Sequence, residues 1–170
     1  EGHTGFASNL NSLAWVLQAK GDYGGAEPLL REALSMQRRL LGDEHPDLVV
    51  TLNKLGMLLK ETGDYEGAEL QLREALAMRR RLLGDEHPQV ALSLNNLAFV
   101  MLARGDLESA ESLLREALRM RRRLFGGEHP DVVVSISNLA MVLKKKGDLE
   151  AAEPLLREVL AMRRRTLHEN

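Results

Sequence analysis

Histidine and acidic residues recur together along the chain, and both types can ligate metals or transfer protons. They form three similar triplets: Asp43-Glu44-His45, Asp85-Glu86-His87 and Gly127-Glu128-His129. Equivalent histidines lie one repeat apart, roughly 20 Å if two packed helices of about 8 to 10 Å each separate them. A zinc–ligand bond is only about 2 Å long, so different triplets cannot share an ion. We therefore predict no metal site and no cofactor, and assign these histidines to helix starts or loop ordering.

The remaining residue types do not form a recognisable catalytic set. No candidate nucleophile has a base and an orienting partner at a known spacing, and every glycine cluster lies at a predicted turn rather than in a phosphate-binding loop. The chain has no cysteine, which excludes disulfides and thiolate chemistry. The sequence therefore predicts a protein that is not an enzyme, and the lack of cysteine favours a reducing, cytoplasmic compartment.

Runs of arginine would, by themselves, suggest binding to phosphate groups. They are Arg38-Arg39, Arg79 to Arg81, Arg121 to Arg123 and Arg163 to Arg165. Each run falls near the predicted C-terminal end of a helix, where the helix dipole favours cations, and glutamates offset the charge. Since the formal net charge is -2, we expect a solvated, ion-paired surface and no nucleic acid partner. RNA binding is the weaker alternative.

The sequence also shows no membrane segment. No apolar run approaches the ~20 residues that a spanning helix needs, and the start of the chain lacks a signal pattern. The chain has no initiator methionine and begins within a repeat. We therefore expect no membrane association. We also expect the chain to be a piece of a longer protein.

All these residues are positioned by a repeat of 42 residues. The pairs Gly21-Asp22, Gly63-Asp64, Gly105-Asp106 and Gly147-Asp148 mark it in one register, and His3, His45, His87 and His129 mark it in another. Units of this size cannot bury an apolar face alone and must stack on their neighbours. The period predicts a single array over residues 1–170, with repeats at 3–44, 45–86, 87–128 and 129–170.

Each repeat is predicted to form two helices. In the second repeat, His45-Pro46-Asp47 opens a helix that continues from Leu48 to about Glu61, and Gly63 ends it. Asp64 then precedes a helix from about Tyr65 to Leu83, and so short a turn requires an antiparallel hairpin. The candidate buried residues are Leu52, Leu55, Gly56, Leu59, Ala68, Leu72, Ala75, Leu76, Leu82 and Leu83.

The segments "LNKLG", "LNNLA" and "ISNLA", the Gly-Asp turn and the "LGDEHPD" connector resemble the tetratricopeptide repeat in its 42-residue, kinesin light chain-like variant. The resemblance implies an all-α, right-handed superhelical solenoid of four antiparallel helix-turn-helix repeats. In that family the first helix of each repeat lines a concave surface that binds peptide segments. Kinesin light chains take peptides with an aromatic residue among acidic ones.

Helical spacing places Leu10, Leu13, Ala14 and Leu17 in a buried stripe, so residues beside that stripe face the groove. In the family, asparagines at the position of Asn11 bond the backbone of a bound peptide; the alternative is that they bond neighbouring repeats. The large apolar column that starts at Trp15 is either ligand contact or core packing. Lys60 and Lys144 would attract an acidic peptide. The predicted peptide-binding residues are Asn11, Asn53, Asn95, Trp15, Met57, Phe99, Met141, Lys60, Lys144, Asn96 and Asn138.

Together these patterns predict a noncatalytic protein-interaction module that binds a peptide segment of a partner protein in its concave groove. The alternative is a structural or self-assembling scaffold, engineered or recently duplicated, because the repeats are nearly identical. No polar capping helix follows Arg165, so we expect homo-oligomers through the terminal helices under this alternative.

Overall fold

The computed structural model describes the backbone of residues 2–168 and the side chains of residues 5–165. Within this part of the chain it contains eight α-helices and no strand, so the all-α prediction is confirmed. The helices are α1 (Gly2–Ala19), α2 (Tyr23–Leu41), α3 (Pro46–Thr62), α4 (Tyr65–Leu83), α5 (Pro88–Arg104), α6 (Leu107–Phe125), α7 (Pro130–Lys146) and α8 (Leu149–His168). The two helices predicted in the second repeat match α3 and α4 to within two residues.

Local sequence signals set the ends of these helices. His45 precedes α3, and its Nδ1 accepts a hydrogen bond from the backbone N–H of Asp47 at 3.2 Å. The equivalent histidines cap α5 and α7 in the same way, so the predicted capping role is confirmed. Gly63 ends α3 with a φ of 86°, which a residue with a Cβ rarely adopts. Asp64 then caps α4 by accepting from the backbone N–H of Gly67 at 2.9 Å.

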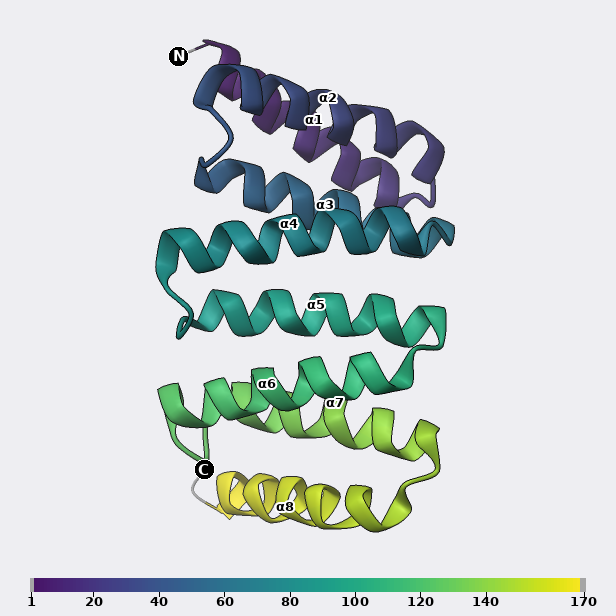
Figure 1. Cartoon of the computed structure of the whole chain (residues 1–170), viewed down its shortest axis with the longest axis vertical. Coiled ribbons are helices and arrows are strands. Elements are labelled where there is room, and N and C mark those ends of the chain that lie inside the picture. The colour runs from purple at the N-terminus through teal and green to yellow at the C-terminus, as the bar shows by residue number, and fades with distance from the viewer. Residues whose placement is uncertain (1, 169–170) are drawn as a thin grey trace. The chain divides into compact units, whose positions relative to one another are not determined.

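The chain forms two compact units, Glu1–Asp85 (unit 1) and Glu86–Asn170 (unit 2). In unit 1, α3 packs against both α2 and α4, while α1 packs against α2 (Figure 1). Unit 2 repeats this order, because α5 packs on α6, α6 on α7 and α7 on α8. Each unit therefore holds two helical hairpins. The single array over residues 1–170 stays a prediction, and residues 169–170 of the fourth repeat lie outside the described residues.

Leucines and alanines fill the core of each unit. In unit 1, α3 approaches α4 so closely that a Cβ at Gly56 would lie 2.7 Å from Cγ of Leu72. The burial predicted for Leu82 and Leu83 is wrong, since these side chains are 39% and 45% exposed. The reason is length: α4 has 19 residues and α3 has 17, so the last turn of α4 extends past the first residue of α3. The other predicted core residues of the second repeat are buried: Leu52, Leu55, Gly56, Leu59, Ala68, Leu72, Ala75 and Leu76.

The first helix departs from the predicted burial. Leu13 is 49% exposed, whereas its equivalents Leu55 and Leu139 are 1% exposed. The helices that carry these two equivalents pack on a preceding helix, α2 or α6. No helix precedes α1 in the described part of the chain, so the prediction for Leu13 is wrong. Leu17 is half-buried for the same reason, while Leu10 is buried as predicted.

Candidate functional site

In unit 1 the asparagine column joins two helices. Asn11 on α1 is 7% exposed, and its Nδ2 donates to Oγ1 of Thr51 on α3 at 2.8 Å. Nζ of Lys54, also on α3, donates to the backbone carbonyl of Asn11 at 3.4 Å. Oδ1 of Asn11 is buried and has no hydrogen-bond partner among the described residues. The junction is therefore held by Asn11 but leaves one of its acceptors unsatisfied.

In unit 2 the same repeat position forms a closed amide pair. Oδ1 of Asn95 on α5 accepts a hydrogen bond from Nδ2 of Asn138 on α7 at 2.8 Å. Nearby, Nη1 of Arg121 donates to Oγ of Ser135 at 2.6 Å and to the backbone carbonyl of Asp131 at 3.4 Å. These contacts join neighbouring repeats, which was the alternative reading of the asparagines. A contact between Asn11, Asn95 or Asn138 and a peptide stays a prediction.

The other two predicted asparagines, Asn53 and Asn96, are less buried than Asn11 and Asn95. Nδ2 of Asn53 donates to the backbone carbonyl of Val49, one turn earlier in α3, at 2.6 Å. The side chain of Asn53 is half-buried, and so is that of Asn96 on α5. Both residues make further contacts within the protein. The amide of Asn53 is thus engaged in this structure, and a role of either residue in peptide binding stays a prediction.

The apolar column lies at the surface rather than in the core. Trp15 is 64% exposed and Met141 is 38% exposed, while Met57 and Phe99 are half-buried. A second exposed column lies two turns earlier in the same helices and consists of Val50, Leu92 and Val134, at 49%, 39% and 51%. These exposures leave the side chains available for contact with a partner.

An open depression of about 250 Å³ lies between α1 and α3 in unit 1. Gln37, at the C-terminal part of α2, also lines it; this residue is 5% exposed, and its Oε1 has no partner among the described residues. Two buried acceptors, Asn11 Oδ1 and Gln37 Oε1, therefore belong to residues of one depression. The lining residues are Ser8, Asn11, Ser12, Gln37, Asp47, Val50 and Lys54.

The predicted lysines occupy different settings. Nζ of Lys60 lies 2.6 Å from a carboxylate oxygen of Glu61, so its charge is already paired. Lys144 is exposed and lines an open depression in unit 2 together with Ser137, Met141 and Leu156. Lys144 is thus the better placed of the two to attract an acidic group.

Most residues of the arginine runs are exposed and several are paired, as predicted. Nη2 of Arg38 lies 2.6 Å from Oε1 of Glu74, and Nη2 of Arg122 lies 2.8 Å from Oε1 of Glu158. The prediction of a solvated surface is wrong for Arg121, which is 7% exposed, because this side chain turns inward to bond Ser135. Burial lowers the pKa of Arg121, and that of Arg79 as well.

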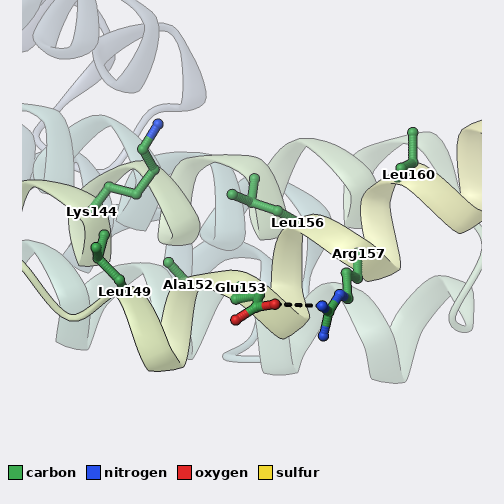
Figure 2. Close-up of a pocket in the computed structure, with 7 residues that line it drawn as sticks. All are labelled: Lys144, Leu149, Ala152, Glu153, Leu156, Arg157 and Leu160. Carbon is green, nitrogen blue, oxygen red and sulfur yellow. Dashed lines mark ion pairs between the residues drawn. The ribbon is translucent and has the colours of Figure 1, made fainter.

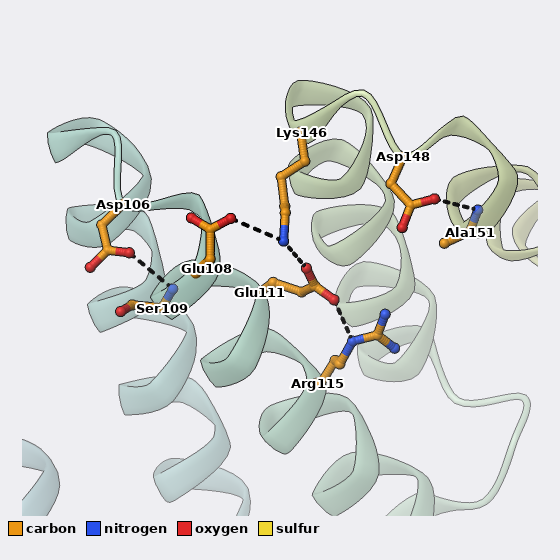
Figure 3. Close-up of polar contacts among 8 residues, drawn as sticks. All are labelled: Asp106, Glu108, Ser109, Glu111, Arg115, Lys146, Asp148 and Ala151. Atoms are coloured by element: carbon orange, nitrogen blue, oxygen red, sulfur yellow. Dashed lines mark hydrogen bonds and ion pairs between the residues drawn. The ribbon is translucent and has the colours of Figure 1, made fainter.

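A cluster of charges on α6 and α7 stabilises the junction in unit 2 (Figure 3). Glu111 accepts hydrogen bonds from Nζ of Lys146 and from Nε of Arg115, each at 2.7 Å. These donors hold the pKa of Glu111 below its ordinary value. The same hydrogen bond raises the pKa of Lys146 above its ordinary value. These contacts form a structural ion-pair network.

The described residues contain no group of three or more histidine, aspartate or glutamate side chains placed to hold a metal ion. None of the helices in this part of the chain is long and apolar enough to cross a membrane.

The family model of the tetratricopeptide repeat matches residues 6–81, 71–123 and 89–165. The chain belongs to the tetratricopeptide repeat family. Domains of this family are protein-interaction modules. No curated protein matches the chain significantly.

Several solved structures resemble the chain closely in fold. BtubC (BKLC) from P. vanneervenii is 26% identical with a TM-score of 0.86; the match covers 94% of this chain and 64% of that one. A putative kinesin light chain with nearly identical TPR-like repeats, from Podosopora anserina, is 27% identical with a TM-score of 0.84. The match covers 94% of this chain and 76% of that one. The apo form of RapI is similar in fold alone, with 16% identity and a TM-score of 0.81. The match covers 98% of this chain and 58% of that one. The kinesin light chain-like resemblance is thus confirmed, and the chain spans about two thirds of the length of BtubC.

Proposed function

We propose that the chain is a noncatalytic module that binds a peptide segment of a partner protein on the face formed by α1 and α3. The observation that carries the proposal is the pair of unsatisfied acceptors, Asn11 Oδ1 and Gln37 Oε1, on residues that line one open depression. A buried acceptor without a partner costs about 1 to 3 kcal/mol. Rotation of either amide toward an N–H donor in the depression removes this cost, and a peptide backbone supplies such donors.

The same face offers apolar area to a ligand. Trp15 lies one helical turn from Asn11 on α1, and Val50 lines the depression from α3. Burial of exposed apolar surface contributes about 25 cal/mol per Å². Because the Asn11–Thr51 hydrogen bond already fixes α1 against α3, little receptor entropy is lost on binding.

Charge favours a peptide that carries acidic side chains. Lys54 lines the depression, and its Nζ reaches only the backbone carbonyl of Asn11, at 3.4 Å, which leaves donors for a ligand carboxylate. Asp47 also lines the depression and disfavours a carboxylate on its own side. The site therefore suits a peptide with an aromatic residue and an acidic neighbour, the type that the kinesin light chain resemblance implies.

The test is isothermal calorimetry with a peptide that has one tryptophan flanked by acidic residues. We expect measurable binding, and Val50→Asp should weaken it about tenfold, because an added carboxylate opposes both burial and the ligand charge. Val50 is 49% exposed, so this change does not disturb the core. Leu70→Asp is the matched control, since Leu70 on α4 is 65% exposed and does not line the depression.

Two results would contradict the proposal: equal affinity for a peptide in which lysines replace the acidic residues, or unchanged affinity in Val50→Asp. Replacement of Asn53 and Asn95 is a less selective test, because Asn95 also holds Asn138. A cytoplasmic location and the absence of a nucleic acid partner stay predictions from composition.

A further inference from the structure

The repeat position of Gln37 carries arginine in the other three repeats, as Arg79, Arg121 and Arg163. In unit 2 the guanidinium of Arg121 reaches from α6 to α7, where its Nη1 donates to Oγ of Ser135 and to the backbone carbonyl of Asp131. Burial lowers the pKa of Arg121, and the negative charge of Asp131 opposes that shift. Unit 2 therefore shows that this position of the repeat can hold a buried guanidinium among oxygen acceptors.

Unit 1 keeps acceptors at this place but lacks the guanidinium. Asp47 on α3 stands at the repeat position of Asp131. Gln37 is shorter than an arginine, and its Oε1 is itself an acceptor that is buried without a partner among the described residues. Oδ1 of Asn11 is a second acceptor of this kind. Both residues are more than nine-tenths buried and line the depression between α1 and α3, so that depression lacks hydrogen-bond donors.

The carboxylate of Asp47 adds a negative charge to these acceptors. Its side chain is 57% exposed and lines the same depression. Nδ1 of His45 lies 3.7 Å from this carboxylate, but that nitrogen already accepts the capping hydrogen bond from the backbone N–H of Asp47 and so carries no proton to donate. The carboxylate is therefore available to a cationic group of a ligand.

The lining of the depression favours one class of cation. Two buried acceptors beside a carboxylate match a planar, positively charged group that has several N–H donors, and a guanidinium is such a group, whereas a backbone amide has a single N–H. Lys54 also lines the depression and repels a cation close to itself. The same lysine attracts a carboxylate, so the depression suits an arginine that has an acidic neighbour.

The larger depression on α8, of about 380 Å³, differs in its chemistry. Its lining is mainly apolar and includes Leu149, Leu156 and Leu160. Its carboxylate, Glu153, already pairs with Arg157 (Figure 2). The two buried oxygens that lack a partner among the described residues both belong to residues of the depression between α1 and α3. The need for N–H donors is thus a property of that internal junction.

We infer that the depression between α1 and α3 binds the guanidinium group of an arginine on the partner peptide. The guanidinium takes the place that Arg121 has in unit 2, donates to Oδ1 of Asn11 and Oε1 of Gln37, and faces the carboxylate of Asp47. An acidic residue beside the arginine pairs with Lys54. The inference rests on the proposed function, because the peptide carries the arginine, and it adds which side chain enters the depression.

The first test uses methylguanidinium alone and follows the side-chain N–H signals of Asn11 and Gln37 by nuclear magnetic resonance. We expect saturable shifts with a dissociation constant in the millimolar range, as suits a ligand of so few atoms. Methylammonium has the same charge without the planar set of donors, so it should bind at least about fivefold more weakly. The inference is overturned if methylguanidinium causes no saturable shift, or if methylammonium binds equally well.

Gln37→Arg supplies the guanidinium from the chain itself. The other three repeats carry arginine at this position, so the fold accommodates it. We expect the variant to bind methylguanidinium at least about tenfold more weakly, measured at the signals of Asn11. Ser35→Arg is the matched control and should bind normally, because Ser35 is exposed on α2 and does not line the depression. Unchanged binding in Gln37→Arg would overturn the inference.

The second test is calorimetry with the acidic tryptophan peptide. Arginine is placed beside the acidic residues, at each position in turn, and citrulline at the same position is the control, because it is planar but uncharged. We expect one arginine peptide to bind about tenfold more tightly than its citrulline counterpart. This difference should disappear in Gln37→Arg and persist in Ser35→Arg.

The outcomes distinguish this inference from the proposed function. If methylguanidinium binds but arginine gives no advantage at any position of the peptide, the occupant is not an arginine of the partner and the inference is overturned. If the peptides bind but methylguanidinium does not, the inference fails and the proposed function stands. Binding of methylguanidinium without binding of any peptide would contradict the proposed function and support the guanidinium site.

Discussion

In unit 1 the junction between α1 and α3 is held by Asn11 and Thr51, whereas in unit 2 the equivalent junction between α5 and α7 is held by the amide pair of Asn95 and Asn138. Lys54 takes the repeat position of Asn138, and its ammonium reaches the backbone of Asn11 instead of the amide oxygen. The two junctions lie at equivalent repeat positions but differ in which acceptors are satisfied.

The neighbouring position shows the same contrast. Arg121 in unit 2 extends inward and bonds Ser135, while Gln37, at the same position in unit 1, is too short to repeat these contacts and leaves its Oε1 unpaired. Two sequence differences, Lys54 in place of Asn138 and Gln37 in place of Arg121, therefore distinguish the junctions. The junction in unit 2 is closed, because its polar side chains bond one another, and the junction in unit 1 is open, because it leaves buried acceptors unpaired. The open junction in unit 1 is therefore where we place peptide binding, and the closed one in unit 2 is expected to contribute stability.

The largest expected effect is on the closed junction. Arg121→Ala removes a charged donor and leaves the hydroxyl of Ser135, which is 1% exposed, without it. We expect the free energy of unfolding to fall by about 2 to 3 kcal/mol, measured by urea denaturation. Arg163→Ala is the matched control, because Arg163 has the same repeat position but is exposed, and it should change stability by less than about 0.5 kcal/mol. Equal losses in both variants would show that burial of Arg121 is not what stabilises the junction.

A smaller effect is expected when the open junction is converted to the closed type. Lys54→Asn places an amide where Asn138 stands in unit 2, so its N–H can donate to Oδ1 of Asn11. We expect a gain of about 1 kcal/mol in the free energy of unfolding and weaker binding of the acidic peptide. Lys54→Ala distinguishes loss of the cation from gain of an amide donor, since it removes the cation without adding a donor. A gain of the same size in Lys54→Ala would rule out the amide pair as the source.

The smallest expected effect concerns acid stability. The pKa of Glu111 in the folded state is lowered by Lys146 and Arg115, so the stability that this carboxylate provides is present above its unfolded pKa, near 4.5, and is lost as pH falls through the folded pKa. Glu111→Gln should therefore reduce the loss of stability in acid by less than about 1 kcal/mol. Glu27→Gln is the control in unit 1, where Thr62 occupies the position of Lys146 and supplies no cation. Urea denaturation at neutral pH and below pH 4 compares them, and identical acid profiles for the two variants would refute the assignment.

Much of the fold was predictable because its signals are local. The histidine caps, the left-handed glycines and the aspartate caps each depend on residues within three or four positions, and the structure has them where the sequence placed them. Ion pairs between residues four positions apart are equally local, such as Glu27 with Arg31, where Oε1 and Nε lie 2.8 Å apart. The repeat period and the family resemblance followed from the same regularity.

The sequence by itself thus determined the helices, their ends and the pairing of helices into hairpins, because these depend on spacing along one segment. Only the tertiary structure decided which of several equivalent residues is buried or bonded. Leu13 and Leu55 occupy the same repeat position, but only Leu55 lies on a helix that packs against a preceding one. Asn11 and Asn95 are equally buried, yet their partners are a hydroxyl and an amide. Equivalent positions differ because burial and hydrogen bonding depend on the neighbouring repeat, which the residue's own repeat does not encode.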